Sequence, residues 1–222
     1  MDKELPGQLQ QIYARRFDAQ DEYRNRVWGV LVRDFFQQFV SPEDAVLDLG
    51  CGYGQFINHI QAAEKYAMDL NPQAREALEP DITFLEQDCS LDWPLLDGTL
   101  DLVFSSNFFE HLPAKPTLEK TIQEAARCLR KGGQIIAMGP NIRYVGGAYW
   151  DFWDHHIPLT ERSLSELLET NGFKVESAIS RFLPYTMVNQ REMPTAVIKL
   201  YLRLRFAWRL SGGQFLVVGR RI

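Results

Sequence analysis

The sequence predicts an α/β fold in which helices cover both faces of a mainly parallel sheet. Three observations predict it. Short apolar runs alternate with amphipathic stretches from Ala45 onward, glycines follow the first apolar run, and acidic residues follow the second and third. Strands that alternate with helices form parallel sheets, and their carboxyl ends meet at one edge, where ligands bind.

A helix is predicted before the first strand. Four apolar residues recur there at helical spacing: Val27, Leu31, Phe35 and Phe39. The helix should end near Ser41 and Pro42, because the residue before a proline disfavours helical backbone angles.

Seven apolar runs have the length and composition of buried strands. They are Ala45–Leu49, Tyr66–Met68, Ile82–Leu85, Leu100–Ser105, Gln134–Met138, Phe173–Ile179 and Gln214–Val218. The 222-residue chain has room for one such domain with modest additions.

The stretches between the strands predict helices. One is expected over Gln55–Ala62, a short one begins at Pro72, and Thr117–Leu129 forms a third that Lys131, Gly132 and Gly133 bring to an end. A capping box at Ser163–Glu166 opens a fourth, which ends at Asn171 and Gly172. A fifth is expected over Pro194–Leu210.

We expect a single domain over residues 1–222, divided into four parts. Residues 1–44 form an N-terminal helical cap, 45–180 the core, 181–213 a helical insertion, and 214–222 the last strand. No leading segment resembles a secretion signal, and no apolar run reaches the ~20 residues needed to cross a bilayer. We therefore expect a cytoplasmic protein.

Composition narrows the class of function. Hydrophobic residues make up 45% and charged residues 24%, and the net charge is −5, which disfavours a nucleic-acid substrate. The three cysteines, Cys51, Cys89 and Cys128, are widely spaced. They match neither a metal-binding pattern nor a disulfide framework, so we expect a reducing compartment and no metal site.

Three glycines follow the first predicted strand. Gly50, Gly52 and Gly54 have the spacing G-x-G-x-G. Glycine lets the backbone approach a ligand closely and adopt positive φ. Dinucleotide-binding loops use the longer spacing G-x-G-x-x-G, which opens a helix onto a pyrophosphate. The shorter spacing suits an adenosyl sulfonium amino acid, which carries no phosphate.

Acidic residues follow the next two strands. Asp69 ends the second strand, where a carboxylate can accept hydrogen bonds from both ribose hydroxyls, as it also does in NAD-binding proteins. Asp88 follows the third and can accept a hydrogen bond from the adenine amine, with Leu70 and Cys89 against the ring. Either acid alone can equally be a solvated loop residue. Together with the glycine loop, they predict an adenosyl ligand.

These stretches resemble the class I S-adenosylmethionine-dependent methyltransferases of the Rossmann-like superfamily. The resemblance covers residues 45–141 through the motifs VLDLGCGYG, YAMDLNP, QDCSLDWPL, LDLVFSSNFFEHLP and RCLRKGGQIIAMGPN. Within this superfamily, the chain most resembles the small-molecule methyltransferases of the ubiquinone/menaquinone and sugar-modifying type, or the glycan-associated branch. It implies the strand order 3-2-1-4-5-7-6, with only the seventh strand antiparallel.

The resemblance also implies S-adenosyl-L-methionine as cofactor and S-adenosyl-L-homocysteine as product. The methionine end is expected to contact Asp48, Gly50, Gly52 and Gly54, and the intervening Cys51 and Tyr53 are also expected to bind the cofactor. Asp69 then binds the ribose, Asp88 and Cys89 the adenine, and Ser106 with Asn107 forms the floor near the sulfonium. Relatives often close their N-terminal segment over the cofactor, so Arg16 and Arg24 are candidates for the methionine carboxylate; a solvated helix is the alternative.

Candidate catalytic residues follow strands four and five. Methyl transfer is an in-line displacement, and it needs a general base only when the nucleophile must lose a proton. His111 is one candidate, although Glu110 and His111 can instead tie a loop to the core. His155 and His156 are the others. An acceptor pocket is expected from Tyr144, Tyr149, Trp150 and Trp153, and the alternative is an aromatic cluster with surface histidines.

The acceptor is expected to be a small molecule, a lipid-linked molecule or a glycan, methylated on O, N or C. The helix over residues 194–210 is apolar and carries Lys199, Arg203, Arg205 and Arg209. It can lie on a membrane surface, or form a lid or dimer interface with its cations reaching water. We expect a monomer or homodimer. A nicotinamide-dependent oxidoreductase and a non-catalytic cofactor-binding protein are the alternative functions.

Overall fold

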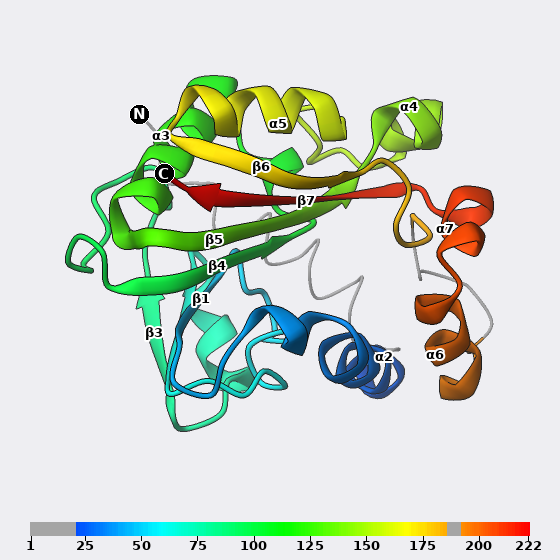
Figure 1. The fold of residues 1–222 in the computed structure, drawn as a ribbon, viewed down its shortest axis with the longest axis horizontal. Helices are drawn as coiled ribbons and strands as arrows, with labels where there is room; N and C mark the ends of the chain where they lie inside the picture. The colour runs from blue at the N-terminus through cyan, green and yellow to red at the C-terminus, as the bar shows by residue number, and fades with distance from the viewer. Residues whose placement is uncertain (1–20, 186–191) are drawn as a thin grey trace.

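A computed structural model describes residues 21–185 and 192–222. Its centre is a seven-stranded sheet in the order β3-β2-β1-β4-β5-β7-β6 (Figure 1). The strands are β1 (Ala45–Leu49), β2 (Glu64–Asp69), β3 (Ile82–Glu86), β4 (Leu100–Ser106), β5 (Leu129–Pro140), β6 (Phe173–Ile179) and β7 (Gln214–Arg221). Strand β7 runs antiparallel to both of its neighbours, and the pairs from β3 to β5 are parallel. The expected fold class and strand order are confirmed.

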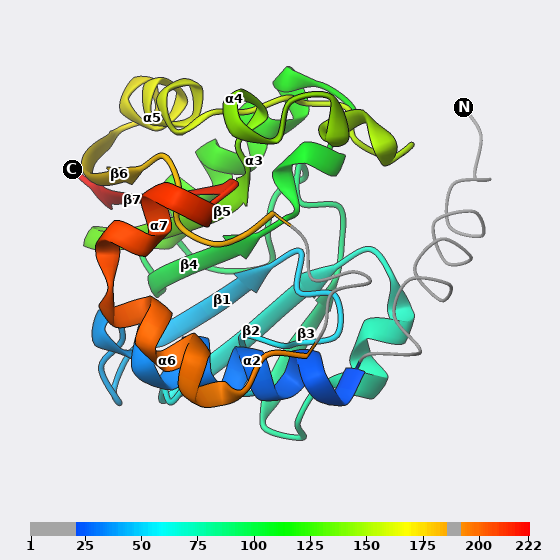
Figure 2. The ribbon, with the colours of Figure 1, turned by 90° about the vertical axis from the view of Figure 1, so that its right-hand side faces the viewer.

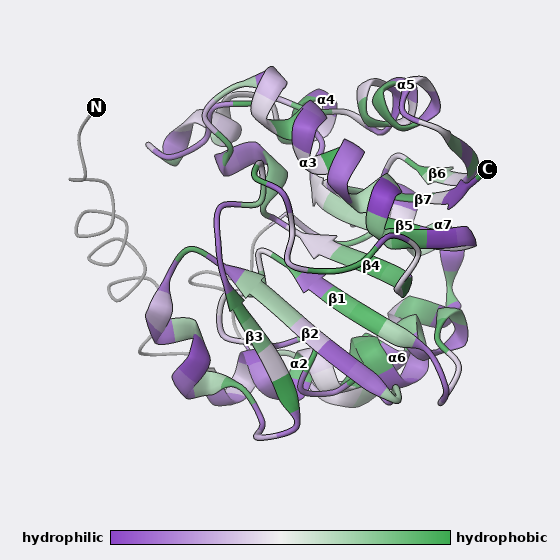
Figure 3. Cartoon of the chain, turned by 90° about the vertical axis from the view of Figure 1, so that its left-hand side faces the viewer, coloured by the Kyte–Doolittle hydropathy of each residue, from purple (hydrophilic) through white to green (hydrophobic). Residues whose placement is uncertain are grey.

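Helices cover both faces of the sheet (Figures 1 and 2). Helices α2 (Asp21–Asp34), α6 (Thr195–Arg203) and α7 (Arg205–Ser211) lie on one face, and α3 (Lys115–Cys128) and α5 (Glu161–Thr170) lie on the other. Successive strand residues point to opposite faces, so Val46 packs toward α2 whereas Leu47 packs toward α3. The central strands are therefore largely hydrophobic (Figure 3).

The helix predicted before the first strand is present as two pieces. Helix α2 ends at Asp34, and the 3-10 helix η1 (Phe36–Phe39) continues it until Val40 becomes extended. This matches the boundary predicted from Pro42. The apolar stripe of α2 packs on the sheet through Val27 and Leu31.

The helix predicted over Gln55–Ala62 is wrong: that segment is a run of hydrogen-bonded turns. Its bonds alternate between two spacings, because His59 N donates to Phe56 O while Asn58 N donates to Gly54 O. The Asn58 side chain also donates to Ala77 O and accepts from Glu79 N, which ties the turns to the segment after β2. Tertiary hydrogen bonds thus outweigh the local helical pattern.

Two helix boundaries also differ from prediction. The capping box lies three residues earlier than expected, between Thr160 and Ser163, since each side chain accepts from the backbone N–H of the other. Helix α3 ends at Cys128 without the predicted glycine stop. The chain continues directly into β5, and Gly132, with φ of 78°, lies inside that strand.

The remaining short elements connect these layers. The 3-10 helix η2 (Pro72–Ala77) begins at the predicted proline, and η3 (Phe109–His111) follows β4. Helix α4 (Ile142–Val145) and η4 (Gly146–Asp151) follow β5. The single helix predicted over Pro194–Leu210 is instead two, α6 and α7, because the backbone of Leu204 leaves the helical region at ψ of 78°.

Candidate active site

A cavity of about 590 Å³ opens at the carboxyl ends of the parallel strands. Residues from three regions line it: the ends of β1 and β2, the segments after β4 and β5, and helices α2 and α6. The structure brings eleven of the sequence-predicted site residues to its walls, namely Arg24, Asp48, Gly50, Cys51, Gly52, Tyr53, Asp69, Ser106, Asn107, His111 and His155. The carboxyl edge of the sheet is therefore the candidate active site, as an open α/β fold predicts.

The glycine loop has the backbone that its sequence predicts. Gly50, Gly52 and Gly54 all have positive φ, between 51° and 70°. A Cβ atom on Gly50 would lie 2.2 Å from the Phe108 ring, so only glycine fits there. A Cβ atom on Gly52 would meet nothing within 4 Å, so that part of the loop borders open cavity that a ligand can enter.

Asp69 holds the glycine loop in place. Its Oδ2 accepts a hydrogen bond from Gly52 N at 2.9 Å, and its Oδ1 accepts one from Asn71 N at 2.9 Å. Burial raises the pKa of the carboxyl group, and the backbone hydrogen bonds oppose that shift. The side chain also lines the cavity. The loop and the acid are therefore one unit.

Asp48 is a buried acid on the same wall. It lies near the carboxyl end of β1 and is 3% exposed. Burial raises the pKa of its carboxyl group to about 8. A hydrogen bond from the Ile57 backbone opposes that shift, and the negative charge of Asp69 adds to it. A cationic group in the cavity would favour the ionised carboxylate. This wall therefore suits a positively charged ligand.

The residues predicted to bind adenine do not line this cavity. Asp88 Oδ1 accepts hydrogen bonds from Ser90 N and Ser90 Oγ at 2.8 and 2.7 Å. Cys89 is buried against Thr121, and burial raises the pKa of its thiol to about 11. Leu70 is exposed. The binding of adenine by these three residues stays a prediction. Gly54, which was expected at the methionine end, packs against Leu78 and does not line the cavity either.

The floor of the cavity follows β4. Ser106 and Asn107 line it, and Asn107 Nδ2 donates to Ser106 Oγ at 3.0 Å. Asn107 has φ of 49° and is the one residue other than glycine with positive φ in the described part of the chain. Its backbone N–H donates to Met138 O on β5. The chain thus turns sharply here, directly beside the cavity.

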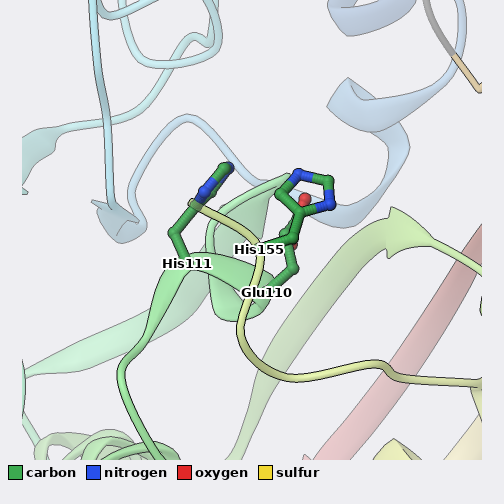
Figure 4. Close-up of side chains that lie close together, drawn as sticks. All are labelled: Glu110, His111 and His155. Atoms are coloured by element: carbon green, nitrogen blue, oxygen red, sulfur yellow. The ribbon is translucent and has the colours of Figure 1, made fainter. Parts of the chain in front are cut away.

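Three titratable side chains meet on the β4–β5 side of the cavity. Glu110 and His111 lie in η3, and His155 lies in the segment after η4 (Figure 4). One ligand atom from each side chain, a ring nitrogen or a carboxylate oxygen, lies within 4.8 Å of the other two. Burial raises the pKa of Glu110 to about 7, and the charge of His111 opposes that shift.

Asp154 determines the tautomer of His111 and contributes to the shift of its pKa. The His111 Nδ1 atom lies 3.0 Å from the Asp154 carbonyl oxygen and 3.2 Å from its Oδ2. A carbonyl oxygen can only accept, so Nδ1 carries the proton and Nε2 has a lone pair when the ring is neutral. Burial lowers the pKa of His111, but hydrogen bonding to Asp154 and the charge of Glu110 outweigh it, and the net shift is upward.

His156 and the four predicted wall residues do not line the cavity, and their role in binding an acceptor stays a prediction. His156 is exposed, as are Trp150 and Trp153 at 58% and 89%. Tyr149 is buried and donates to Ile157 O, and Tyr144 lies against the Arg181 guanidinium. Aromatic residues that do line the cavity on this side include Phe108, Phe152 and Tyr185. Helix η4 directs its aromatic rings outward or into the core, which composition does not reveal.

Other cavity residues were not found from sequence. They form an apolar wall contributed by α2 and α6: Tyr23, Val27, Leu31, Val197, Ile198 and Tyr201. Gln214, at the start of β7, lines the cavity, and its buried Oε1 has no hydrogen-bond partner among the residues that the structure describes. The helical periodicity signalled buried residues on α2, but nothing in it indicated which of them face a cavity. Arg16 lies outside the described residues.

The comparisons with known proteins decide the family. The model of the methyltransferase domain family matches residues 47–137. An Encephalitozoon cuniculi protein named "Putative methyltransferase" is 31% identical over 73% of this chain and 83% of its own length. The chain belongs to the class I S-adenosylmethionine-dependent methyltransferases. The methyltransferase uses S-adenosylmethionine as its cofactor, as the sequence resemblance implied.

Solved structures share the fold of this methyltransferase at low sequence identity. One is described as the "Complex between the Haloferax volcanii Trm112 methyltransferase activator and the putative methyltransferase", with a TM-score of 0.68, 20% identity, and coverage of 95% of this chain and 97% of that chain. An S-adenosylmethionine-dependent methyltransferase from Archaeoglobus fulgidus has a TM-score of 0.67, 19% identity, and coverage of 91% and 97%.

The cavity of the methyltransferase fits its cofactor. The open space at Gly52 admits a ligand against the loop backbone, and the buried acid Asp48 suits the ammonium and sulfonium charges. Turns follow the loop, rather than the helix N-terminus that a pyrophosphate requires. None of the helices in the described ranges combines the length and hydropathy of a bilayer-spanning segment.

Proposed function

We propose that this methyltransferase transfers a methyl group to a hydroxyl of a small molecule with an apolar body. The observation that carries the proposal is the division of the cavity into three walls. The glycine loop with Asp48 and Asp69 forms one, the cluster of Glu110, His111 and His155 forms a second, and apolar residues of α2 and α6 form the third.

The first wall suits the cofactor. S-adenosylmethionine, when bound, supplies a methyl group that its sulfonium already activates. Asp48 offers a carboxylate to the cationic methionine end, and the Gly50–Gly54 backbone lets that end approach closely. Asp69 fixes the loop and presents its carboxylate to the ribose. Ser106 and Asn107 border the space between this wall and the cluster.

The second wall suits the reacting group of the acceptor. Three titratable side chains line the cavity there, the buried Glu110 and His155 and the partly buried His111, which favours a nucleophile that has a proton to lose. An acceptor oxygen forms the new O–C bond, and the C–S bond breaks with its electron pair passing to sulfur. The hydroxyl proton passes to a side chain of this second wall and from there to solvent. The walls must also hold the oxygen ~3–3.5 Å from the methyl carbon.

The third wall favours an apolar acceptor body. Val27 and Leu31 of α2 line the cavity together with Val197, Ile198 and Tyr201 of α6, and α6 packs against α2 (Figure 2). Of the two roles considered for residues 194–210, this arrangement supports a lid over the cavity rather than a helix that lies on a membrane surface. A small acceptor whose apolar body lies against this wall is shielded from water on that side, as an in-line displacement requires.

The experiment that tests the proposal is a methyl-transfer assay with radiolabelled S-adenosylmethionine and a panel of apolar alcohols, phenols and matched amines. We expect methylation of hydroxyl compounds. His155→Ala should lower kcat by about 100-fold or more, in the range of a lost acid–base group, while the affinity for S-adenosylhomocysteine by calorimetry stays within twofold.

His156→Ala is the matched control, because the neighbouring His156 is exposed and does not line the cavity. We expect this variant to retain activity. Exclusive methylation of amines would contradict the hydroxyl assignment. Equal activity in the two histidine variants would contradict the role given to the second wall.

A further inference from the structure

The cluster of Glu110, His111 and His155 has the composition of a metal site. One carboxylate and two imidazoles come together from segments that are 44 residues apart in sequence, and each offers a ligand atom within 4.8 Å of the others (Figure 4). Glu110 and His155 are 3% and 7% exposed. Two histidines with one carboxylate form a common donor set for zinc, manganese and iron ions.

The surroundings orient both imidazoles. His111 Nδ1 donates a hydrogen bond to the backbone carbonyl oxygen of Asp154 at 3.0 Å, which leaves the lone pair of Nε2 for a bond to a metal ion. Metal-binding histidines are typically held in this way, with the second ring nitrogen donating to a carboxylate or carbonyl. The His155 ring stacks on Phe152 with centroids 5.0 Å apart and contacts Tyr149 at 4.5 Å.

The geometry requires little movement. The His111 and His155 rings stand 4.8 Å apart at 70°, in an edge arrangement rather than a stack. Ligand atoms bonded at about 2.1 Å to one ion stand roughly 3 Å apart, so side-chain shifts of about 1 Å close the set. The cluster also lines the cavity, so an ion held there would be accessible to an acceptor.

We propose that Glu110, His111 and His155 bind a divalent transition-metal ion that positions the acceptor hydroxyl. The inference rests on the proposed function. Three protein ligands leave coordination positions open toward the cavity, and an acceptor oxygen can occupy one of them. The bound oxygen loses its proton to solvent, forms the O–C bond with the methyl carbon, and the C–S electron pair passes to sulfur.

The first experiment measures metal binding alone. The full chain is dialysed against a chelator and then titrated with Mn²⁺, and separately with Zn²⁺, by calorimetry, with electron paramagnetic resonance for Mn²⁺. We expect one ion per chain. Glu110→Gln and His155→Gln should each weaken binding at least about tenfold, whereas His156→Gln, which changes the exposed neighbour, should bind normally.

Circular dichroism and S-adenosylhomocysteine binding show whether each variant is folded, so a misfolded variant is replaced by His111→Gln. Absence of binding to the unsubstituted chain would overturn the proposal. Binding that all cluster variants retain would also overturn it, because the ion would then lie elsewhere.

The second experiment separates this inference from the proposed function. Methyl transfer to a hydroxyl acceptor is measured after chelation and after Mn²⁺ or Zn²⁺ is restored. Loss and recovery of kcat are expected. Full activity in the chelator would reject the metal and leave the proposed function standing. Hydroxyl acceptors that are never methylated, with or without metal, would reject the proposed function itself.

Discussion

At the scale of single residues, Asp48 makes a prediction about pH. Burial raises the pKa of its carboxyl group from the ordinary value of 3.8 to about 8, so the free native protein carries a proton there at neutral pH. A cationic cofactor favours the ionised form. Binding below pH 8 should therefore release a proton, and affinity should rise by up to about tenfold per pH unit until it levels off above pH 8.

Calorimetry in buffers of different ionisation enthalpy measures this proton release directly. Asp48→Asn has no titrating carboxyl group, so its affinity should be lower and the pH slope should be absent. A slope that survives in Asp48→Asn would show that another group releases the proton. The raised pKa of Asp48 also affects folding. Between pH 4 and pH 8 the native state retains a proton that the unfolded chain has lost, so the contribution of this residue to the free energy of unfolding falls as pH rises.

Gln214 makes a second residue-scale prediction. Its Nε2 donates to Pro184 O, but its buried Oε1 at the cavity wall accepts no hydrogen bond from residues 21–185 or 192–222. A ligand donor there would remove the cost of that unsatisfied oxygen. Gln214→Met should therefore raise the acceptor KM by about tenfold, the equivalent of ~1.4 kcal/mol, and leave S-adenosylhomocysteine affinity unchanged.

The unchanged cofactor affinity is the internal control in that measurement. An unchanged KM would mean that Gln214 only supports the Pro184 backbone. Equal losses of cofactor and acceptor binding would instead indicate a general disturbance of β7.

Residue positions were predictable from sequence where the chain itself fixes them. The glycine loop and Asp69 directly follow the first two strands, so identifying the strands located both. The acceptor wall was not predictable in this way. Trp153 and Phe152 are adjacent, yet only Phe152 reaches the cavity. Both residues lie in the irregular segment just after η4, where side-chain direction depends on tertiary packing that composition does not record.

At the scale of elements, apolar runs located the strands well, because a strand buried on both faces has little else in its sequence. Helices were less certain. The turns after the glycine loop have helical apolar spacing, but Asn58 binds Ala77 and Glu79 across the structure. Helix α6 and α7 looked continuous, and only the backbone of Leu204 separates them.

Helix α6 makes the prediction at this scale. Val197 lines the cavity, whereas Leu200, on the same helix, is 56% exposed and does not. Val197→Ser removes apolar contact surface and should raise the acceptor KM by about five- to tenfold, from a loss of ~1 kcal/mol. Leu200→Ser is the matched control, and its KM should stay within twofold.

Steady-state kinetics with the identified acceptor measures both variants, and calorimetry shows whether cofactor binding is intact. A larger effect from Leu200→Ser would argue that the outer face of α6 contacts a membrane or a second chain. That outcome would return residues 194–210 to the interface role.

At the scale of the whole molecule, the sheet assembles the site from distant sequence. Strands β1 and β4 are neighbours although 50 residues lie between the last residue of β1 and the first residue of β4. The Ser105 Oγ atom on β4 donates a hydrogen bond to Leu49 O on β1. The strand order came from the resemblance to the family rather than from residue patterns. Local patterns specify strands, but only pairing across the sheet specifies which strand ends become neighbours.

This assembly makes the last prediction, on hydrogen exchange. S-adenosylhomocysteine binds at one edge of the sheet, so its binding energy should suppress local opening there and not elsewhere. Amides of residues 50–58 and 104–111 should exchange more slowly in the complex, although they are far apart in sequence. Helix α5 and strand β6, on the other side of β7, should exchange at unchanged rates. Protection confined to 50–58 would mean that the β4 side contributes nothing to the cofactor. Uniform protection of all segments would mean that the ligand stabilises the fold globally, because exchange then proceeds through complete unfolding rather than local opening.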